Sequence, residues 1–128
     1  MKPIFPVTVF SLNKTSADLK AVFDSGSFYT IIRADKLPVN TQVINQEISF
    51  GTANKKASLK VRGQTILVIK IGEKMVQGEV LVSDELGSDM LIGAGLMQTW
   101  DISILNTNGK TKINVTHDMR DPEINEVV

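Results

Sequence analysis

The sequence contains no cysteine, a single histidine and no excess of either charge. Without cysteine there is no disulfide framework, no thiol nucleophile and no cysteine-based zinc site, and one histidine excludes a multi-histidine metal site within one chain. We therefore expect no metal and no cofactor. Fourteen basic and fourteen acidic side chains cancel without a long run of either sign, which argues against nucleic acid or an anionic membrane as a partner. Any catalysis must depend on carboxylates, hydroxyls or lysine.

Long apolar runs are also missing. No stretch approaches the length of about 20 apolar residues that a membrane-spanning helix needs. Residues 1–10 lack the continuous apolar segment and the small-residue cleavage site of a signal peptide. These absences predict a cytoplasmic protein with no membrane partner. The chain of 128 residues is long enough for one domain with a sizeable core.

An acidic, hydroxyl-rich loop stands between two apolar, β-prone runs. Its sequence is Asp24-Ser25-Gly26-Ser27, and it follows residues 19–23, which predict a strand. Aspartate is depleted from strands and rarely buried without a partner, so neighbours must hold this carboxylate. The serines supply hydroxyls, and Gly26 lets the backbone turn sharply and bring an amide close to the carboxylate. The loop can therefore present Asp24 in a fixed pose.

A second motif places a glycine at the end of a short apolar run. Leu91-Ile92-Gly93 predicts a short buried strand, and residues 94–100 predict the one short helix of the chain. The two motifs together resemble those of the retropepsin-like aspartic proteases, in which Asp-Thr/Ser-Gly follows an apolar strand and an apolar-apolar-Gly strand end precedes a short helix. The sequence departs from this family at Gly95, where many members have aspartate.

The resemblance extends over about residues 5–116 of a single domain that spans residues 1–128. It is to a single-lobe member of bacterial or archaeal type. It implies an aspartic endopeptidase that acts on a peptide or protein substrate.

The resemblance also implies roles for individual residues. Asp24 is the catalytic residue, the Ser25 hydroxyl bonds across a twofold axis, Gly26 aims the carboxylate and Ser27 orients it. Leu91, Ile92 and Gly93 would then lie beside this loop as a structural motif.

Two copies of the chain are needed for this chemistry. Peptide hydrolysis by carboxylates without a metal requires one group that accepts a proton from water and another that donates one to the carbonyl. Two aspartates that share a site cannot readily both ionise, as is known for aspartic proteases, so one of them keeps a proton. The sequence has only one Asp-Ser-Gly motif. The second Asp24 must therefore come from a second copy, and twofold homodimers are the commonest soluble oligomers.

The pattern of short β-prone runs predicts an all-β barrel or sandwich. The resemblance specifies a closed acid-protease barrel of six or seven strands with one short helix near the C-terminal third. Turn residues predict hairpins at 13–16, 72–74 and 108–109. The expected strands lie at residues 7–12, 19–23, 42–50, 57–61, 65–71, 75–82, 90–92, 101–105 and 112–115.

Two connecting segments complete the expected fold. Residues 33–37 favour one helical turn that Pro38 ends, because proline disfavours helix in the residue before it. Beyond Thr116 the chain becomes polar, and we expect this tail to be frayed or docked on a partner subunit.

A small polar tip, Gly51-Thr52-Ala53-Asn54, separates two strand-capable arms. By position it resembles the flap that covers the substrate in the family. The alternative is an ordinary mobile hairpin tip.

Two alternatives to catalysis remain open. Asp24 can be a hydrogen-bonded turn residue without a chemical role. The whole chain can also be a non-catalytic peptide-binding or assembly module that keeps the barrel and groove. Dimerisation does not separate these functions from the protease.

Overall fold

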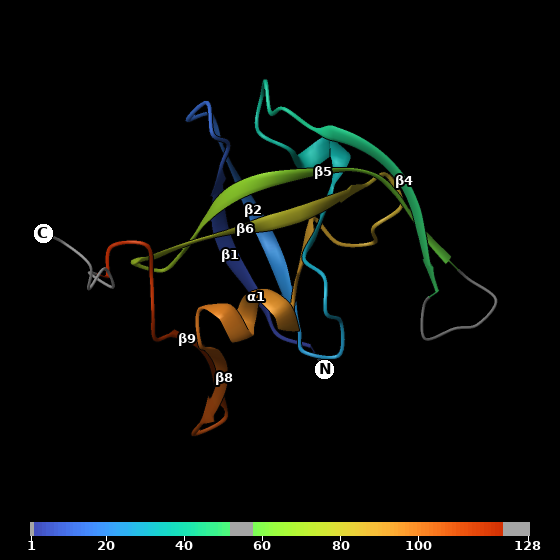
Figure 1. Cartoon of the computed structure of the whole chain (residues 1–128). Helices are drawn as coiled ribbons and strands as arrows, with labels where there is room; N and C mark the ends of the chain where they lie inside the picture. Colours follow the sequence, from blue (N-terminus) through green and yellow to red (C-terminus); the bar gives the residue numbers. More distant parts are fainter. Residues whose placement is uncertain (1, 52–57, 122–128) are drawn as a thin grey trace, which may run out of the picture.

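The computed structural model describes residues 2–51 and 58–121, which form mainly β-strands (Figure 1). The strands within these ranges are β1 Ile4–Phe10, β2 Ser16–Asp24, β3 Ile31–Arg33, β4 Ile44–Gly51, β5 Ser58–Ile71, β6 Lys74–Ser83, β7 Met90–Gly93, β8 Ile102–Thr107 and β9 Lys110–Val115. The helices in the same ranges are the 3-10 helix η1, Ala34–Lys36, and the α-helix α1, Ala94–Thr99. None of the helices in these two ranges is long and apolar enough to cross a membrane.

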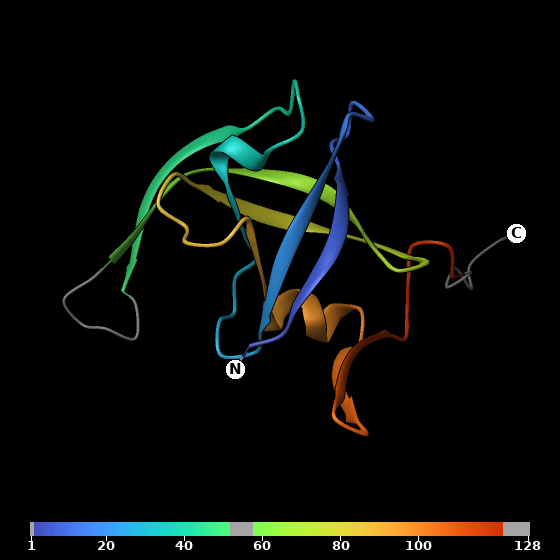
Figure 2. The same ribbon diagram turned by 180° about the vertical axis from the view of Figure 1, so that it is seen from behind.

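Six strands close into a barrel. The sheet order is β1-β2-β7-β3-β6-β5-β4, and β1 also pairs with β5, so the ring closes and β4 extends from it beyond β5. The strands β8 and β9 form a separate two-stranded sheet, which projects from the α1 end of the barrel (Figures 1 and 2). The expected all-β barrel with one short α-helix is confirmed.

β7 lies between β2 and β3 in the sheet. These two strands follow each other in the chain, whereas β7 comes much later in the sequence. It pairs in parallel with β2, with Asp24 opposite Gly93, and antiparallel with β3, with Ile31 opposite Leu91. The loop that joins β2 to β3 must therefore pass over the end of β7. This crossing positions the candidate site.

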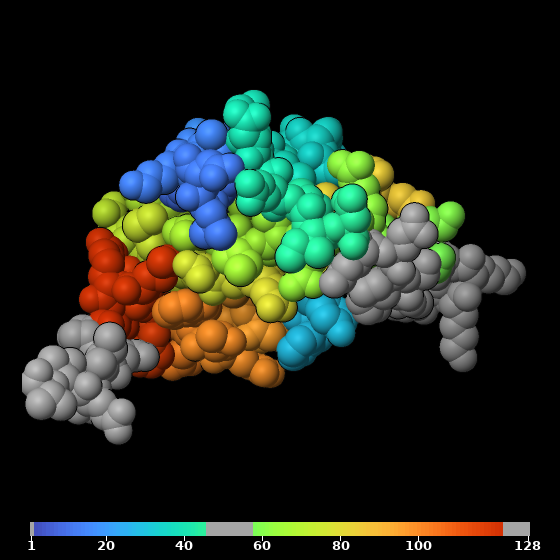
Figure 3. Space-filling model, turned by 45° about the horizontal axis from the view of Figure 1, so that its top comes forward, coloured from blue at the N-terminus to red at the C-terminus, as the bar shows by residue number. Residues whose placement is uncertain are grey.

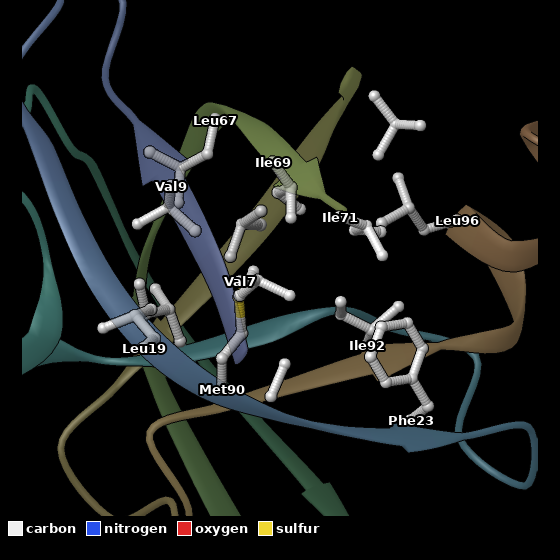
Figure 4. Close-up of a cluster of buried hydrophobic side chains, with 14 of the residues drawn as sticks. Val7, Val9, Leu19, Phe23, Leu67, Ile69, Ile71, Met90, Ile92 and Leu96 are labelled. Carbon is white, nitrogen blue, oxygen red and sulfur yellow. The ribbon is translucent and has the colours of Figure 1, made fainter. Parts of the chain in front are cut away.

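Alternating side chains of the strands fill the barrel. In β2, Leu19, Ala21 and Phe23 are buried, as the two-residue period of a strand requires when one face meets a core. Phe23 lies opposite Ile92 in the ladder, and both belong to the main core cluster (Figure 4). Because Phe23 faces inward, the next residue in β2, Asp24, faces the other way.

The predicted turns and helices agree with the structure. Hairpins join β1 to β2, β5 to β6 and β8 to β9 at the predicted turns. Asn108 and Gly109 both have positive φ, 53° and 74°, as a tight hairpin turn requires. α1 ends one residue before the predicted boundary, and η1 forms the predicted turn before Pro38.

Two predictions need correction. Residues 57–61 and 65–71 were expected as separate strands, but β5 runs without a break through Gly63. A Cβ at Gly63 would collide with the side chain of Val43, so the glycine admits this neighbour instead of ending the strand.

The second correction concerns the start of the tail beyond Thr116: residues 117–121 dock on their own chain, and residues 122–128 lie outside the described residues. The Asp118 carboxylate accepts a hydrogen bond from the Met75 N–H at 3.1 Å, and the Met119 N–H donates to the Met75 carbonyl at 2.8 Å. The surface of this segment lies against the turn between β5 and β6 in Figure 3. Neither fraying nor a partner subunit is needed to hold residues 117–121, because the backbone N–H and carbonyl of Met75 already do so.

Candidate active site

Asp24 is the last residue of β2, where the strand enters the loop toward β3. Its side chain is 15% exposed. The alternation that buries Phe23 turns Asp24 away from the core, and the ladder puts it opposite Gly93. The carboxylate is therefore largely covered yet still reachable from one side.

Two donors hold the Asp24 carboxylate. The Lys2 ammonium lies 2.8 Å from Oδ2, and the Gly26 N–H donates to Oδ1 at 3.0 Å. The hydrogen bond from Lys2 lowers the pKa of Asp24; burial opposes this effect, and the Gly26 N–H adds to it. In the single chain Asp24 is thus an ionised carboxylate at neutral pH, which suits a proton acceptor.

The loop after β2 and the start of α1 bind each other through backbone groups. The Ser27 carbonyl accepts a hydrogen bond from the Ala94 N–H at 2.6 Å, and the Phe28 carbonyl accepts one from the Gly95 N–H at 3.0 Å. These bonds satisfy N–H groups of the first helical turn, which the N-cap residue Gly93 has no side chain to satisfy. The loop is fixed without any side-chain cap.

Gly93 sits beneath this loop. A Cβ at Gly93 would lie 2.6 Å from the carbonyl oxygens of Ser27 and Phe28 and closer still to that of Tyr29. The Gly93 N–H donates to Thr30 Oγ1 at 3.1 Å, and Thr30 is 5% exposed. Only a residue without a side chain allows the loop to approach β7 this closely.

The two serines of the motif differ in their contacts. The Ser27 N–H donates to the Asp24 carbonyl at 3.2 Å, whereas its hydroxyl donates to the Tyr29 carbonyl at 3.3 Å. The backbone of Ser27, rather than its hydroxyl, therefore bonds to Asp24. Ser25 is exposed.

The departure at Gly95 has a structural counterpart. A Cβ at this position would lie 2.9 Å from Cζ of Phe28, so the aromatic ring occupies the space that a side chain would need. The Gly95 N–H still bonds to the loop. The helix start thus keeps its backbone bonds without an aspartate.

Compared by sequence, the chain matches no protein family and no curated protein. Compared by structure, it is similar to the EIAV protease complexed with the inhibitor HBY-793. The TM-score is 0.61, and the match covers 82% of this chain and 93% of that one. The fold is retropepsin-like. At 16% identity the likeness establishes the fold alone.

A cleft of about 390 Å³ opens beside the loop of this retropepsin-like barrel. It is lined by residues of the loop, of β6 and of α1, among them Tyr29, Glu79 and Leu96. Phe28 also lines it and is 63% exposed. A larger hollow of about 760 Å³ lies across β1, β2 and the end of β5, and Asp24 itself lines neither of the two. Chemistry, not size, therefore identifies the site.

Within the described ranges, the predicted site residues lie in two places. Asp24 to Ser27 and the strand end Leu91 to Gly93 adjoin each other through the pairing of β2 with β7. Gly51, from the expected flap, is the last residue of β4. Thr52, Ala53 and Asn54 fall outside the described residues.

Sequence patterns did not identify two residues that contact the site, Lys2 and Thr30. Lys2 and Thr30 contact the site through pairings between distant segments, and neither belongs to a motif. In the described ranges 2–51 and 58–121, no three His, Asp or Glu side chains are grouped to hold a metal ion.

Proposed function

We propose that the protein is an aspartic endopeptidase that works as a homodimer. The observation that carries the proposal is the Asp24 carboxylate itself, ionised and 15% exposed at a strand end, in a fold similar to that of the EIAV protease. The Gly26 N–H binds this carboxylate at 3.0 Å, and Asp24 lies opposite Gly93 in the ladder. The carboxylate therefore has a defined orientation toward an incoming reactant.

The catalytic step uses two Asp24 carboxylates and one water. One ionised carboxylate accepts a proton from the water, which attacks the peptide carbonyl carbon, while the protonated carboxylate donates its proton to the carbonyl oxygen; the newly protonated carboxylate then gives its proton to the amine nitrogen as the C–N bond breaks, and a hydroxyl of the tetrahedral diol returns a proton to the other carboxylate. A single Asp24 whose pKa is lowered can accept a proton but holds none to donate at neutral pH. The second copy supplies the missing acid, because two carboxylates at one site favour a shared proton.

The loop residues have separate roles in this assembly. Gly26 fixes one carboxylate oxygen through its N–H, and Ser27 bonds to the Asp24 carbonyl through its own N–H. The exposed Ser25 hydroxyl bonds to the partner copy across the twofold axis. The expected flap, which begins at Gly51, the last residue of β4, has the role of covering the bound peptide in this proposal.

A peptide substrate agrees with the surroundings of the loop. The cleft beside it has aromatic, aliphatic and polar lining, and its volume of about 390 Å³ lies within the range of ligand-binding pockets. The function is therefore hydrolysis of a peptide or protein chain, with no metal or other cofactor.

The experiment compares the wild type with Asp24→Asn on a peptide library at several pH values. Asn keeps the volume and removes the ionisable group, so we expect hydrolysis to fall by at least about 10³-fold while the fold survives. Asp84→Asn removes an exposed carboxylate elsewhere and serves as the matched control. Wild-type activity is expected to fall on both sides of an optimum, because the pair must hold one proton. Equal cleavage by wild type and Asp24→Asn would contradict the proposal.

A non-catalytic peptide-binding or assembly module is the second candidate. The observation in its favour is the ion pair between Lys2 and Asp24, which neutralises the carboxylate with a group of its own chain. In that case peptides bind to wild type and to Asp24→Asn alike, and neither protein cleaves them. Calorimetric binding measured beside the cleavage assay separates the two functions.

A further inference from the structure

Lys2 is the cross-strand neighbour of Asp24. β1 and β2 are antiparallel with Ile4 opposite Val22, and the Phe23 N–H donates to the Pro3 carbonyl at 3.0 Å beyond the last ladder pair. Continued by two residues, this register puts Lys2 opposite Asp24. Opposed residues of antiparallel strands have Cβ atoms about 5 Å apart, so the backbone itself brings the ammonium group to the carboxylate. The two ends of these segments lie together in both ribbon views (Figures 1 and 2).

Both oxygens of Asp24 are occupied within the single chain. Gly26 bonds to Oδ1 from inside the loop, whereas Lys2 approaches Oδ2 from a side chain that is 64% exposed. The Gly26 bond belongs to the rigid backbone. Oδ2 is therefore the oxygen that remains for a second carboxylate or a water, and Lys2 covers it.

We propose that Lys2 is a blocking residue that caps Asp24 in the single chain and withdraws from Oδ2 when two copies join. The proposal rests on the dimeric mechanism given above. A shared proton between two carboxylates needs an oxygen from each, and an ammonium group bonded to one of these oxygens favours the doubly ionised, unproductive pair. Withdrawal of Lys2 thus couples assembly of the dimer to formation of the acid–base pair.

Lys2 acts on Asp24 without a charged competitor in the described part of the chain. β7 faces Asp24 with Gly93, the following loop of residues 25–30 has no ionisable group other than Tyr29, and the Coulombic influence on Asp24 comes from Lys2. The hydrogen bond from Lys2, and to a smaller extent its charge, lower the pKa of Asp24. Removal of the ammonium group must therefore raise it.

The cap is weak enough to be reversible. An ion pair with one partner mostly exposed changes an equilibrium by no more than about fivefold. A second copy that contributes its whole contact surface displaces such a pair easily, whereas within residues 2–51 and 58–121 of a single chain no donor other than Lys2 contacts Oδ2. The cap can therefore give way to assembly without preventing it.

The test uses Lys2→Gln beside the matched control Lys20→Gln. Lys20 is an exposed lysine of the same strand as Asp24, so its substitution makes the same change of charge four residues away. Carbon-13 NMR follows the titration of the Asp24 carboxyl in each protein, and sedimentation equilibrium gives the dimer dissociation constant. We expect Lys2→Gln to raise the pKa of Asp24 and to tighten the dimer about fivefold, and Lys20→Gln to do neither.

Each result has a defined meaning. If Lys2→Gln titrates like Lys20→Gln, or leaves the dissociation constant unchanged, the capping role is wrong, whether or not the protein cleaves peptides. If both quantities change as expected while no variant cleaves any peptide, the capping role stands and the proposed hydrolysis fails. Lys2→Arg keeps the charge and is expected to restore the wild-type titration.

Discussion

At the scale of single residues, the site depends most on Gly93, which makes no side-chain contact at all. Its lack of a side chain admits three loop carbonyls, and its N–H fixes Thr30. The path of the loop that follows Asp24 depends on this close approach, while Asp24 itself lies beside Gly93 in the ladder. A glycine in a short buried strand is thus a structural requirement of the loop.

We expect Gly93→Ala to destabilise the protein by about 1–3 kcal/mol, because the new methyl group would press on backbone atoms that cannot rotate away. Gly87→Ala is the control, since a Cβ there meets no atom within 4 Å. Urea unfolding measures both. A Gly93→Ala protein as stable as Gly87→Ala would show that the loop moves freely, contrary to this structure.

At the scale of elements, the segment of residues 117–121 acts as a clasp on the turn between β5 and β6. The Asp118 carboxylate accepts hydrogen bonds from the Met75 N–H, the Arg120 N–H and the Arg120 guanidinium, and its residue is 4% exposed. These donors, first the Met75 N–H and then the groups of Arg120, lower the pKa of Asp118, against the effect of burial. The negative charge of the Asp118 carboxylate is therefore stabilised in the folded protein, and its hydrogen bond to Met75 holds the segment in place.

This lowered pKa predicts how stability depends on pH. A group whose folded-state pKa is depressed stabilises the fold above its unfolded pKa, about 3.9 for aspartate, and loses this contribution as pH falls through the folded value. Asp118→Asn should therefore lower the Tm by several degrees at pH 7, and the difference from wild type should shrink below about pH 4. Thermal unfolding at several pH values measures it.

Asp84→Asn, at an exposed carboxylate, is the control for this effect. It should leave the Tm nearly unchanged at every pH, since an exposed ion pair contributes little. If Asp118→Asn behaved in the same way, the clasp would not stabilise the barrel.

At the scale of the whole molecule, the proposed activity requires an assembly that one barrel cannot replace. Each chain presents one Asp24, and the exposed Ser25 stands next to it at the same loop. The single-domain organisation of residues 1–128 and the cytoplasmic location stay predictions, as does the bacterial or archaeal type. The dimer is the prediction on which the mechanism depends.

We expect sedimentation equilibrium to show a dimer, and Ser25→Ala to weaken it. One hydrogen bond from each copy amounts to about 2 kcal/mol per dimer, or roughly thirtyfold in Kd. Ser16→Ala, at an exposed serine where β2 begins, is the control. A protein that stays monomeric at high concentration and yet cleaves peptides would rule out the paired-carboxylate mechanism.

Local physics made much of this fold predictable from the sequence. Asn108-Gly109 predicts its hairpin because both residues tolerate positive φ, and apolar, β-branched runs predict strands such as β6. The short helix after Gly93 and the loop around Asp24 follow from the same kind of local signal. Each of these features depends on residues a few positions apart.

Other features depend on the register between strands that are distant in the sequence. Lys2 reaches Asp24, Thr30 bonds to Gly93, and Asp118 bonds to Met75 because the closed barrel brings these segments together. No periodicity or turn signal encodes such contacts, since a hydrogen bond between remote segments leaves no local pattern. The sequence by itself determined the carboxylate, its loop and the glycine beneath it, and only the tertiary structure decided which ammonium group faces that carboxylate.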